Sequence, residues 1–404
     1  MTATAPPAPP AETSRSRHFV LAVFALAVGG FAIGTTEFVT MGVLPQIADG
    51  VQVSTSSAGH LISAYALGVV VGVPILSFFV AGLPRKGLLL VFMAFYALFN
   101  ALSAAASGYH LLLVARFLDG LPHGAYFGVA SLVAANLADQ RRRGRAVALV
   151  MLGLSVANVV GVPAATWLGE QFGWRTPYAA AAGLALLTVL LVKLFVPHIA
   201  GDESATGRRE ARQFFTNPQV WLTMLAGAVG FGGMFAVYSY IAPIVIDTAH
   251  LPESTVPLFV LAFGLGMVVG TWLAGELARW SVLRALVLGC ASLLVMLLLY
   301  WMIAPHGWWL WPATFVLSAI TSVIAVNMQL RLMDVAGDAV TLGAAMNHAA
   351  LNIANSLGAF LGGVALDAWS ERSTSLVGAV LAVAGLLFLT WSAVVHRRTA
   401  VSRA

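Results

Sequence analysis

Four ionisable residues lie within long apolar stretches of the sequence, where a charge is costly and usually serves a function. Glu37 occurs in the segment GTTEF, while Arg116, Asp119 and His123 share one later stretch. These three are spaced at i, i+3 and i+7, so a helix would carry them on one face. A carboxylate near an arginine can gain or lose a proton as the site fills and empties. All four are therefore candidates for proton coupling.

A structural role for the same residues is the alternative. Arg116 could neutralise either Glu37 or Asp119 and so hold the surrounding helices in one arrangement. We expect Arg116 to be a fixed counter-charge, and His123 either relays a proton or stays neutral and hydrogen-bonded. The sequence leaves both interpretations open for each carboxylate.

Polar but mostly uncharged side chains form a second group, in the C-terminal half of the chain. Amide and phenol groups can hydrogen-bond a neutral polar ligand, and hydrogen bonding between helices is the alternative. His348, Asn352 and Asn355 are spaced for one helical face. The candidates for a substrate cavity are Tyr238, Tyr240, Asn327, His348, Asn352 and Asn355. By contrast, Asp247, Glu253 and Asp367 are expected near a membrane surface, in contact with solvent.

The composition shows what surrounds these residues. Of the 404 residues, 60% are hydrophobic and only 9% charged, whereas roughly a quarter are charged in soluble proteins. The single cysteine, Cys290, excludes an intramolecular disulfide and a cysteine-based metal cluster. Positive charges are scattered through short loops, so nucleic acid is not an expected partner. No set of nucleophile and base and no set of metal ligands is visible, and an enzyme is therefore not expected.

Apolar runs of about 20 residues, each long enough to cross a bilayer as a helix, recur along the chain. We predict an all-α membrane protein with twelve such helices, near residues 19–43, 58–80, 88–107, 110–134, 146–169, 177–197, 218–243, 256–278, 285–304, 310–333, 340–366 and 374–395. Nearly all Lys and Arg residues of the connecting segments fall on the side that holds both termini. This bias predicts a multi-pass protein of the cytoplasmic (inner) membrane with both termini in the cytoplasm.

Two sequence echoes divide the chain into similar halves. LGVVVG at 67–72 returns as LGMVVG at 265–270, and ANVVG at 157–161 returns as ANSLG at 354–358. A duplicated membrane unit with the binding site between the copies is typical of secondary transporters. The predicted parts are a disordered cytoplasmic tail, a six-helix bundle, a cytoplasmic linker, a second six-helix bundle and a short tail, at residues 1–17, 18–197, 198–217, 218–396 and 397–404.

Small residues recur at every fourth position in four of the predicted helices. Such stripes let helices approach closely in lipid. We expect them to form smooth faces on which the halves rock, with span 2 packed on span 11 and span 5 on span 8. The stripes are Ala64, Gly68 and Gly72 in span 2, Gly153, Ala157, Gly161, Ala165 and Gly169 in span 5, Ala262, Gly266, Gly270 and Ala274 in span 8, and Ala350, Ala354, Gly358 and Gly362 in span 11.

Several motifs together resemble the major facilitator superfamily over about residues 19–396, in particular its twelve-span drug/proton antiporters of the arabinose-efflux-permease type. They are GTTEF, HGAYFG at 123–128, GLSVANVVGVP at 153–163, FGWR at 172–175, YSYIAP at 238–243 and NHAALNIANSLGAFLGG at 347–363. The resemblance implies two pseudo-symmetric six-helix bundles, alternating access and, usually, proton-driven export. It also links Arg116 to proton coupling. The antiporter motif of span 5 would include Gly153, Asn158, Gly161 and Pro163.

The loop between spans 2 and 3 departs from the family's pattern. That loop usually carries an aspartate that helps to latch the outward-facing state, and Ala81 stands at the aligned position. The basic residues Arg85 and Lys86 remain, and they are candidates for a cytoplasmic gate. A weaker or differently built latch is expected.

The sequence therefore predicts a proton-coupled secondary transporter that exports small molecules such as drugs, metabolites or sugars. The proton gradient is the driving force, and no cofactor is expected. The alternative is a nutrient symporter or facilitator on the same fold, because fold alone does not fix function. The expected partners are a small-molecule substrate, protons and the lipid bilayer. A functional monomer is expected, since one chain holds the whole pathway.

Overall fold

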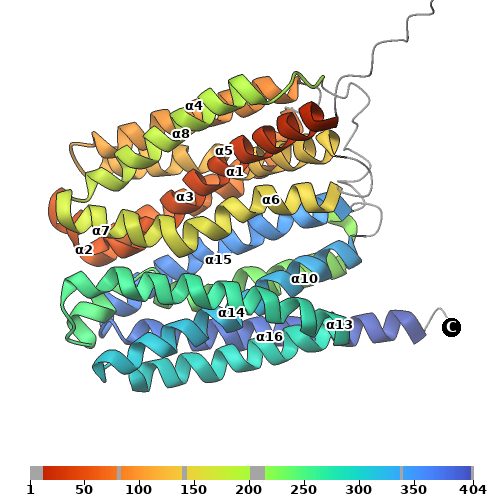
Figure 1. The fold of residues 1–404 in the computed structure, drawn as a ribbon. Helices are drawn as coiled ribbons and strands as arrows, with labels where there is room; N and C mark the ends of the chain where they lie inside the picture. The colour runs from red at the N-terminus through yellow and green to blue at the C-terminus, as the bar shows by residue number, and fades with distance from the viewer. Residues whose placement is uncertain (1–11, 80–82, 139–142, 201–213, 337–339, 402–404) are drawn as a thin grey trace, which may run out of the picture.

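The computed structural model describes residues 12–79, 83–138, 143–200, 214–336 and 340–401, which form long helices lying side by side (Figure 1). Residue Ala81 and most of the predicted linker lie outside these ranges. Both ends of the described chain lie at one end of the bundle, which we call the termini side. The opposite end is called the distal side.

Two layers of helices correspond to the two halves of the sequence (Figure 1). The N-terminal half contains α1 (Glu12–Gly42), α2 (Leu44–Val51), α3 (Thr55–Phe79), α4 (Arg85–Ala104), α5 (Tyr109–Leu137), α6 (Arg143–Val156), the π-helical turn η2 (Ala157–Gly161), α7 (Val162–Phe172) and α8 (Arg175–Phe195). The C-terminal half contains α10 (Pro218–Gly230), α11 (Gly232–Tyr238), α12 (Ile241–Pro243), η3 (Ile244–Thr248), η4 (Glu253–Thr255), α13 (Val256–Ile303), η5 (Gly307–Trp309), α14 (Leu310–Val335), α15 (Val340–Ala368) and α16 (Ser373–Val401).

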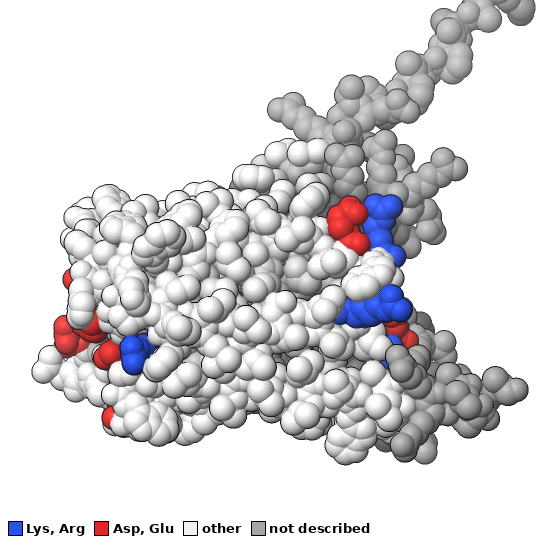
Figure 2. All heavy atoms as spheres, turned by 90° about the horizontal axis from the view of Figure 1, so that it is seen from below, with Lys and Arg blue, Asp and Glu red and all other residues white. Residues whose placement is uncertain are grey.

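Ten segments of the described chain are long and apolar enough to cross a membrane. One of them, Glu253–Ile303, contains 51 residues and joins two crossings across the non-helical Ser281 of α13. The 29-residue helix α5 is also of crossing length but carries Arg116 and Asp119. This arrangement fits the twelve crossings that the sequence predicts. In Figure 2, uncharged side chains cover the flank and charged ones gather at the two ends, as a membrane-spanning protein requires.

The first sequence echo marks equivalent helix contacts inside each half. A Cβ atom on Gly68 of α3 would lie 2.1 Å from the carbonyl oxygen of Phe117 in α5. In the other half, a Cβ atom on Gly266 of α13 would lie 2.2 Å from the carbonyl oxygen of Phe315 in α14. Glycine is therefore required at both places because the backbones touch.

The second echo behaves in the same way. A Cβ atom on Gly161 would lie 2.3 Å from the hydroxyl oxygen of Thr35 in α1, and one on Gly358 of α15 would lie 2.4 Å from the carbonyl oxygen of Gly232 in α11. The prediction that these stripes form the faces between the halves is therefore wrong. They pack each half internally, because a duplicated unit must first bury its own backbone contacts.

The predicted pairs of helices across the halves are confirmed, although other residues make the contacts. The hydroxyl of Ser63 in α3 donates to the carbonyl oxygen of Ser356 in α15 (3.0 Å). Span 5 meets α13 where a Cβ atom on Gly264 would lie 2.2 Å from the carbonyl oxygen of Asn158. On the termini side, α6 packs instead on α1 and α5 of its own half. The contacts between the halves are thus concentrated toward the distal side.

Candidate functional site

An ion pair with an added amide lies at the centre of the N-terminal half. Arg116 Nη1 lies 2.8 Å from Asp119 Oδ2, and both side chains are fully buried. Asn100 of α4 donates its amide N–H to the other carboxylate oxygen, Asp119 Oδ1 (2.6 Å). Charge-assisted hydrogen bonds of this kind are the strong ones. Of the two partners that the sequence leaves open for Arg116, the structure therefore selects Asp119.

Aromatic side chains enclose this ion pair. The Arg116 guanidinium carbon lies 4.3 Å from the ring centre of Tyr65 and 5.3 Å from that of Tyr178. The hydroxyl of Tyr65 lies 2.8 Å from His123 Nδ1 and 3.3 Å from the hydroxyl of Tyr96. One connected network therefore runs from Asp119 through Arg116 and Tyr65 to His123.

Sequence reasoning missed Asn100, Tyr65, Tyr96 and Tyr178. An asparagine within an apolar helix was a usable signal for Asn100, since an amide in lipid needs a partner. The tyrosines carried no such signal, because their rings also suit an apolar core.

Glu37 lies on α1 directly after Thr36, whose carbonyl oxygen accepts a hydrogen bond from Arg116 Nη2 (3.4 Å). It is 7% exposed, and its carboxylate makes no hydrogen bond to the described part of the chain. The neighbouring ring of Phe38 lies 6.0 Å from that of Tyr238 in the other half. Arg116 acts on Glu37 through space, but its close contact is with Asp119. A buried carboxylate without donors is best accommodated with a proton or a ligand bound.

A second contact between the halves lies beside His123. The ring of Phe127 in α5 stacks on that of His348 in α15, with 6.4 Å between centres and 6° between planes. His348 is also the ionisable neighbour of His123. The predicted proton-coupling group and one predicted substrate residue are therefore brought together here.

Amide groups without partners follow His348 along α15. Asn355 is fully buried, and neither its amide nitrogen nor its carbonyl oxygen has a hydrogen-bond partner among the described residues. The side-chain oxygens of Asn347 and Asn352 are likewise buried and unpaired. Unpaired buried polar atoms cost about 1–3 kcal/mol each, so this stripe is costly unless water or a ligand reaches it.

Two predicted cavity residues are used elsewhere. The hydroxyl of Tyr240 donates to the carbonyl oxygen of Ala359 (2.7 Å) and lies against Gly59 of α3, so it belongs to the closed distal side. Asn327 donates to the carbonyl oxygens of Val323 and Ala274, between α14 and α13. The structure does not bring either residue to the amide stripe.

The remaining aromatic candidate, Tyr238, lies at the boundary between the halves. Its ring stacks on that of Phe263 with 3.6 Å between centres, opposite Phe38.

Span 5 contains a break that the sequence does not reveal. A π-helical turn, η2, occupies Ala157–Gly161, and Pro163 follows in the first turn of α7. A π turn and a proline both interrupt the regular ladder of hydrogen bonds and allow a helix to bend. Asn158 lies in this turn with its side-chain oxygen unpaired. Gly153 and Gly161 both face α1.

The candidate gate residues start α4 on the termini side. Lys86 Nζ donates to the carbonyl oxygen of Lys193 near the end of α8 (2.8 Å), and the Arg85 backbone N–H donates to that of Ile199 (2.9 Å). These bonds join α4 to the end of α8 within one half.

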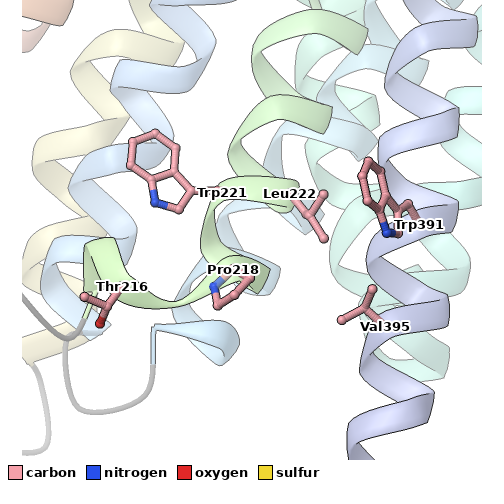
Figure 3. Close-up of a pocket in the computed structure, with 6 residues that line it drawn as sticks. All are labelled: Thr216, Pro218, Trp221, Leu222, Trp391 and Val395. Carbon is pink, nitrogen blue, oxygen red and sulfur yellow. The ribbon is translucent and has the colours of Figure 1, made fainter.

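A surface groove of about 420 Å³ lies apart from these residues, between α10 and α16 on the termini side (Figure 3). Its walls include Trp221 and Trp391. Tryptophan is frequent at the boundary between lipid and water. We therefore assign this groove to the lipid-facing surface.

The chain resembles known membrane transport proteins over most of its length. The model of the Major Facilitator Superfamily matches residues 26–358. The inner membrane transport protein YdhP of Escherichia coli is 38% identical over 92% of this chain and 95% of its own length. AraJ of the same species is 35% identical over 85% and 87%. A chloramphenicol resistance protein of Streptomyces lividans is 31% identical over 84% and 87%.

Among solved structures, that of a D-xylose-proton symporter superimposes with a TM-score of 0.75 at 15% identity, over 92% of this chain and 97% of the other. At this identity the likeness shows the fold alone. The helical architecture and the family match together identify a membrane transporter, not an enzyme. The chain belongs to the Major Facilitator Superfamily.

Proposed function

We propose that this protein is a proton-coupled exporter of small molecules that works by alternating access between its two halves. The positively charged loops favour a cytoplasmic termini side, and the distal side then faces the exterior. The contacts concentrated on the distal side would correspond to a state closed to the exterior.

The observation that carries the proposal is the separation of the two buried carboxylates. Asp119 is held by Arg116 and Asn100, whereas Glu37 has no donor among the described residues and directly precedes Phe38, whose ring faces Tyr238 of the other half. A group at that boundary changes its surroundings when the halves move, which is what proton coupling needs. Asp119 would therefore fix Arg116 in place, and Glu37 would carry the proton.

The substrate would be bound by α15. Among the described residues the side-chain oxygen of Asn352 has no donor and the amide of Asn355 has no partner at all, so together they can accept and donate hydrogen bonds without adding charge. They suit a neutral or weakly polar compound. Export is supported by the antiporter motif of span 5 and by the similarity to a chloramphenicol resistance protein.

The test uses purified protein in liposomes with an imposed pH gradient, and it records proton flux on addition of each compound of a small panel. Wild type should collapse the gradient with at least one compound, and Glu37→Gln should abolish this. Glu276→Gln, at an exposed carboxylate near the end of a helix, is the matched control and should behave as wild type. Compounds that equilibrate equally fast in wild type and Glu37→Gln, without proton flux, would contradict proton coupling.

Import of a nutrient on the same scaffold is the competing function. Expression in a sensitive host separates the two, because an exporter raises resistance to a toxic compound whereas an importer supports growth on a single nutrient. Both readouts should disappear in Asn355→Leu if α15 binds the substrate.

A further inference from the structure

Three polar side chains from both halves meet on the distal side. Gln46 of α2 donates its amide N–H to a carboxylate oxygen of Glu253 in η4. Glu170, near the end of α7, has Glu253 as its charged neighbour. Glu253 was expected to be merely solvated at a membrane surface. It is exposed, but it also joins the C-terminal half to the N-terminal half.

Several buried polar atoms of this contact have no hydrogen-bond partner. Both carboxylate oxygens of Glu170 are buried and have no hydrogen-bond donor among the described residues. The side-chain oxygen of Gln46 is in the same condition. One helical turn before Glu170, the fully buried hydroxyl of Thr166 is also unpaired and lies against Gly42, one turn before Gln46. The carboxylate oxygens of Glu170 and the amide oxygen of Gln46 are thus acceptors to which no described group donates.

No described cation compensates for them. Arg175, at the start of α8, donates to the carbonyl oxygen of Ala106 and lies over the ring of Trp174. Asp49 of α2 is exposed and negative. Two carboxylates that face each other without a cation repel, and the repulsion is strongest where water is excluded.

We propose that a proton held between Glu170 and Glu253 closes the distal side. A protonated Glu170 donates its O–H to the side-chain oxygen of Gln46 or to the Glu253 carboxylate, so one proton removes the repulsion and satisfies unpaired acceptors. When the halves separate on this side, both carboxylates become hydrated and the proton leaves. Acidification on the distal side therefore favours the closed state. This site is separate from Glu37, and the inference rests on the proposed alternating access.

The coupling must be reciprocal, because any ligand that binds one conformation better shifts the equilibrium toward it. If the closed form binds this proton more tightly than the open form does, the ratio of closed to open protein changes about tenfold per pH unit between the pKa of the open form and that of the closed form. A substrate that favours the open form would in turn release this proton.

The experiment measures distances on the distal side by double electron–electron resonance. Spin labels are placed at Gln52→Cys and Ser254→Cys in full-length Cys290→Ser protein in nanodiscs, between pH 5 and pH 8. The short-distance population should grow as the pH falls. Glu170→Gln should hold the short distance at every pH, since an amide N–H replaces the proton. Asp49→Asn, at an exposed carboxylate on α2, should keep the wild-type response.

Two further variants show which carboxylate causes the pH response. Glu253→Gln tests the same contact from the other half and should also remove the pH response. Glu37→Gln should retain it, since the central carboxylate is a different site. A population that opens but ignores pH, or one that follows Ca²⁺ and chelator instead of pH, overturns the proton latch. A distance that never changes under any condition contradicts alternating access and this inference with it.

Discussion

The two halves share their backbone packing but differ in the buried polar groups at their centres, which form an ion pair in one half and uncharged amides in the other. Gly68 against Phe117 and Gly266 against Phe315 are equivalent contacts, so the scaffold is duplicated. Within that scaffold, the N-terminal half surrounds Arg116 with a carboxylate, an amide and aromatic rings. The C-terminal half instead holds amides without partners, such as Asn355.

The difference separates two tasks. An ion pair whose two charges meet within one half stays together while the halves move, and it can hold a charge in the membrane at acceptable cost. Unsatisfied amides are costly at rest, but they gain most when a ligand arrives. The N-terminal half is thus suited to holding charge and the C-terminal half to binding a neutral ligand.

The largest contrast is expected between two buried arginines. Arg116→Leu leaves Asp119 buried without its cation and should lower the free energy of unfolding by about 3–5 kcal/mol. Arg331 of α14 is only 8% exposed, but its Nε and Nη2 atoms have no partner among the described residues. Arg331→Leu should cost much less. Denaturant titration of both variants in detergent checks this, and equal losses would remove the contrast between the halves.

Two fully buried asparagines sharpen the same contrast. Asn100→Leu removes a donor to the Asp119 carboxylate, and hydrogen bonds to charged groups contribute about 1.5–3 kcal/mol. Asn355→Leu removes two unpaired atoms and should be neutral or stabilising for folding, while substrate transport falls. Thermal unfolding and transport are measured on both proteins. A destabilised Asn355→Leu would mean that the amide has a partner in the folded protein.

The glycine contacts at Gly68 and Gly266 should contribute equally to the stability of the two halves. Gly68→Ala and Gly266→Ala each force a Cβ atom onto a carbonyl oxygen of the neighbouring helix. Overpacking of this kind costs about 1–3 kcal/mol, and the two losses should agree closely. Unfolding of the two variants under one set of conditions is the measurement. A large difference would show that the duplication does not extend to packing energetics.

The smallest effect is expected at the distal surface of the C-terminal half. Burial, and then the charge of Glu371, raises the pKa of Asp247 above its usual value, while His250 opposes the rise. A raised pKa in the folded state means that stability is lost as the pH rises above the unfolded value near 3.8. Asp247→Asn should therefore raise the Tm at pH 7, and only slightly, because Asp247 is largely exposed to solvent. At pH 3 the carboxyl is protonated in both the folded and the unfolded state, so the Tm should not change. An unchanged Tm at pH 7 would contradict the shift.

Much of this fold could be predicted from the sequence. Long apolar runs and the echoes at 67–72 and 265–270 indicate the helices and the duplication, because both are properties of one continuous segment. The pairing of span 2 with span 11 also followed, although the stripes of small residues from which it was predicted pack within each half instead. The partner of each individual stripe did not, since Gly153 suits any close neighbour and its true neighbour, α1, is set by the whole bundle.

The site was predictable only in part, for a similar reason. Helical spacing places Arg116, Asp119 and His123 on one face, because they belong to one helix. It says nothing of Asn100 and Tyr65, which arrive from α4 and α3. Spacing likewise could not distinguish Tyr240, which closes the distal side, from a residue that lines a cavity.

The backbone contact between Gly264 and Asn158 has a mechanical consequence. No side chain separates the two halves there, so this point is the natural fulcrum for their rocking. When one half rotates about this point, each of its atoms moves in proportion to its distance from the point. Glu170 lies twelve residues beyond Asn158, about 18 Å along a helix. A small tilt at the glycine would therefore move the outer carboxylates far and Asn158 hardly at all.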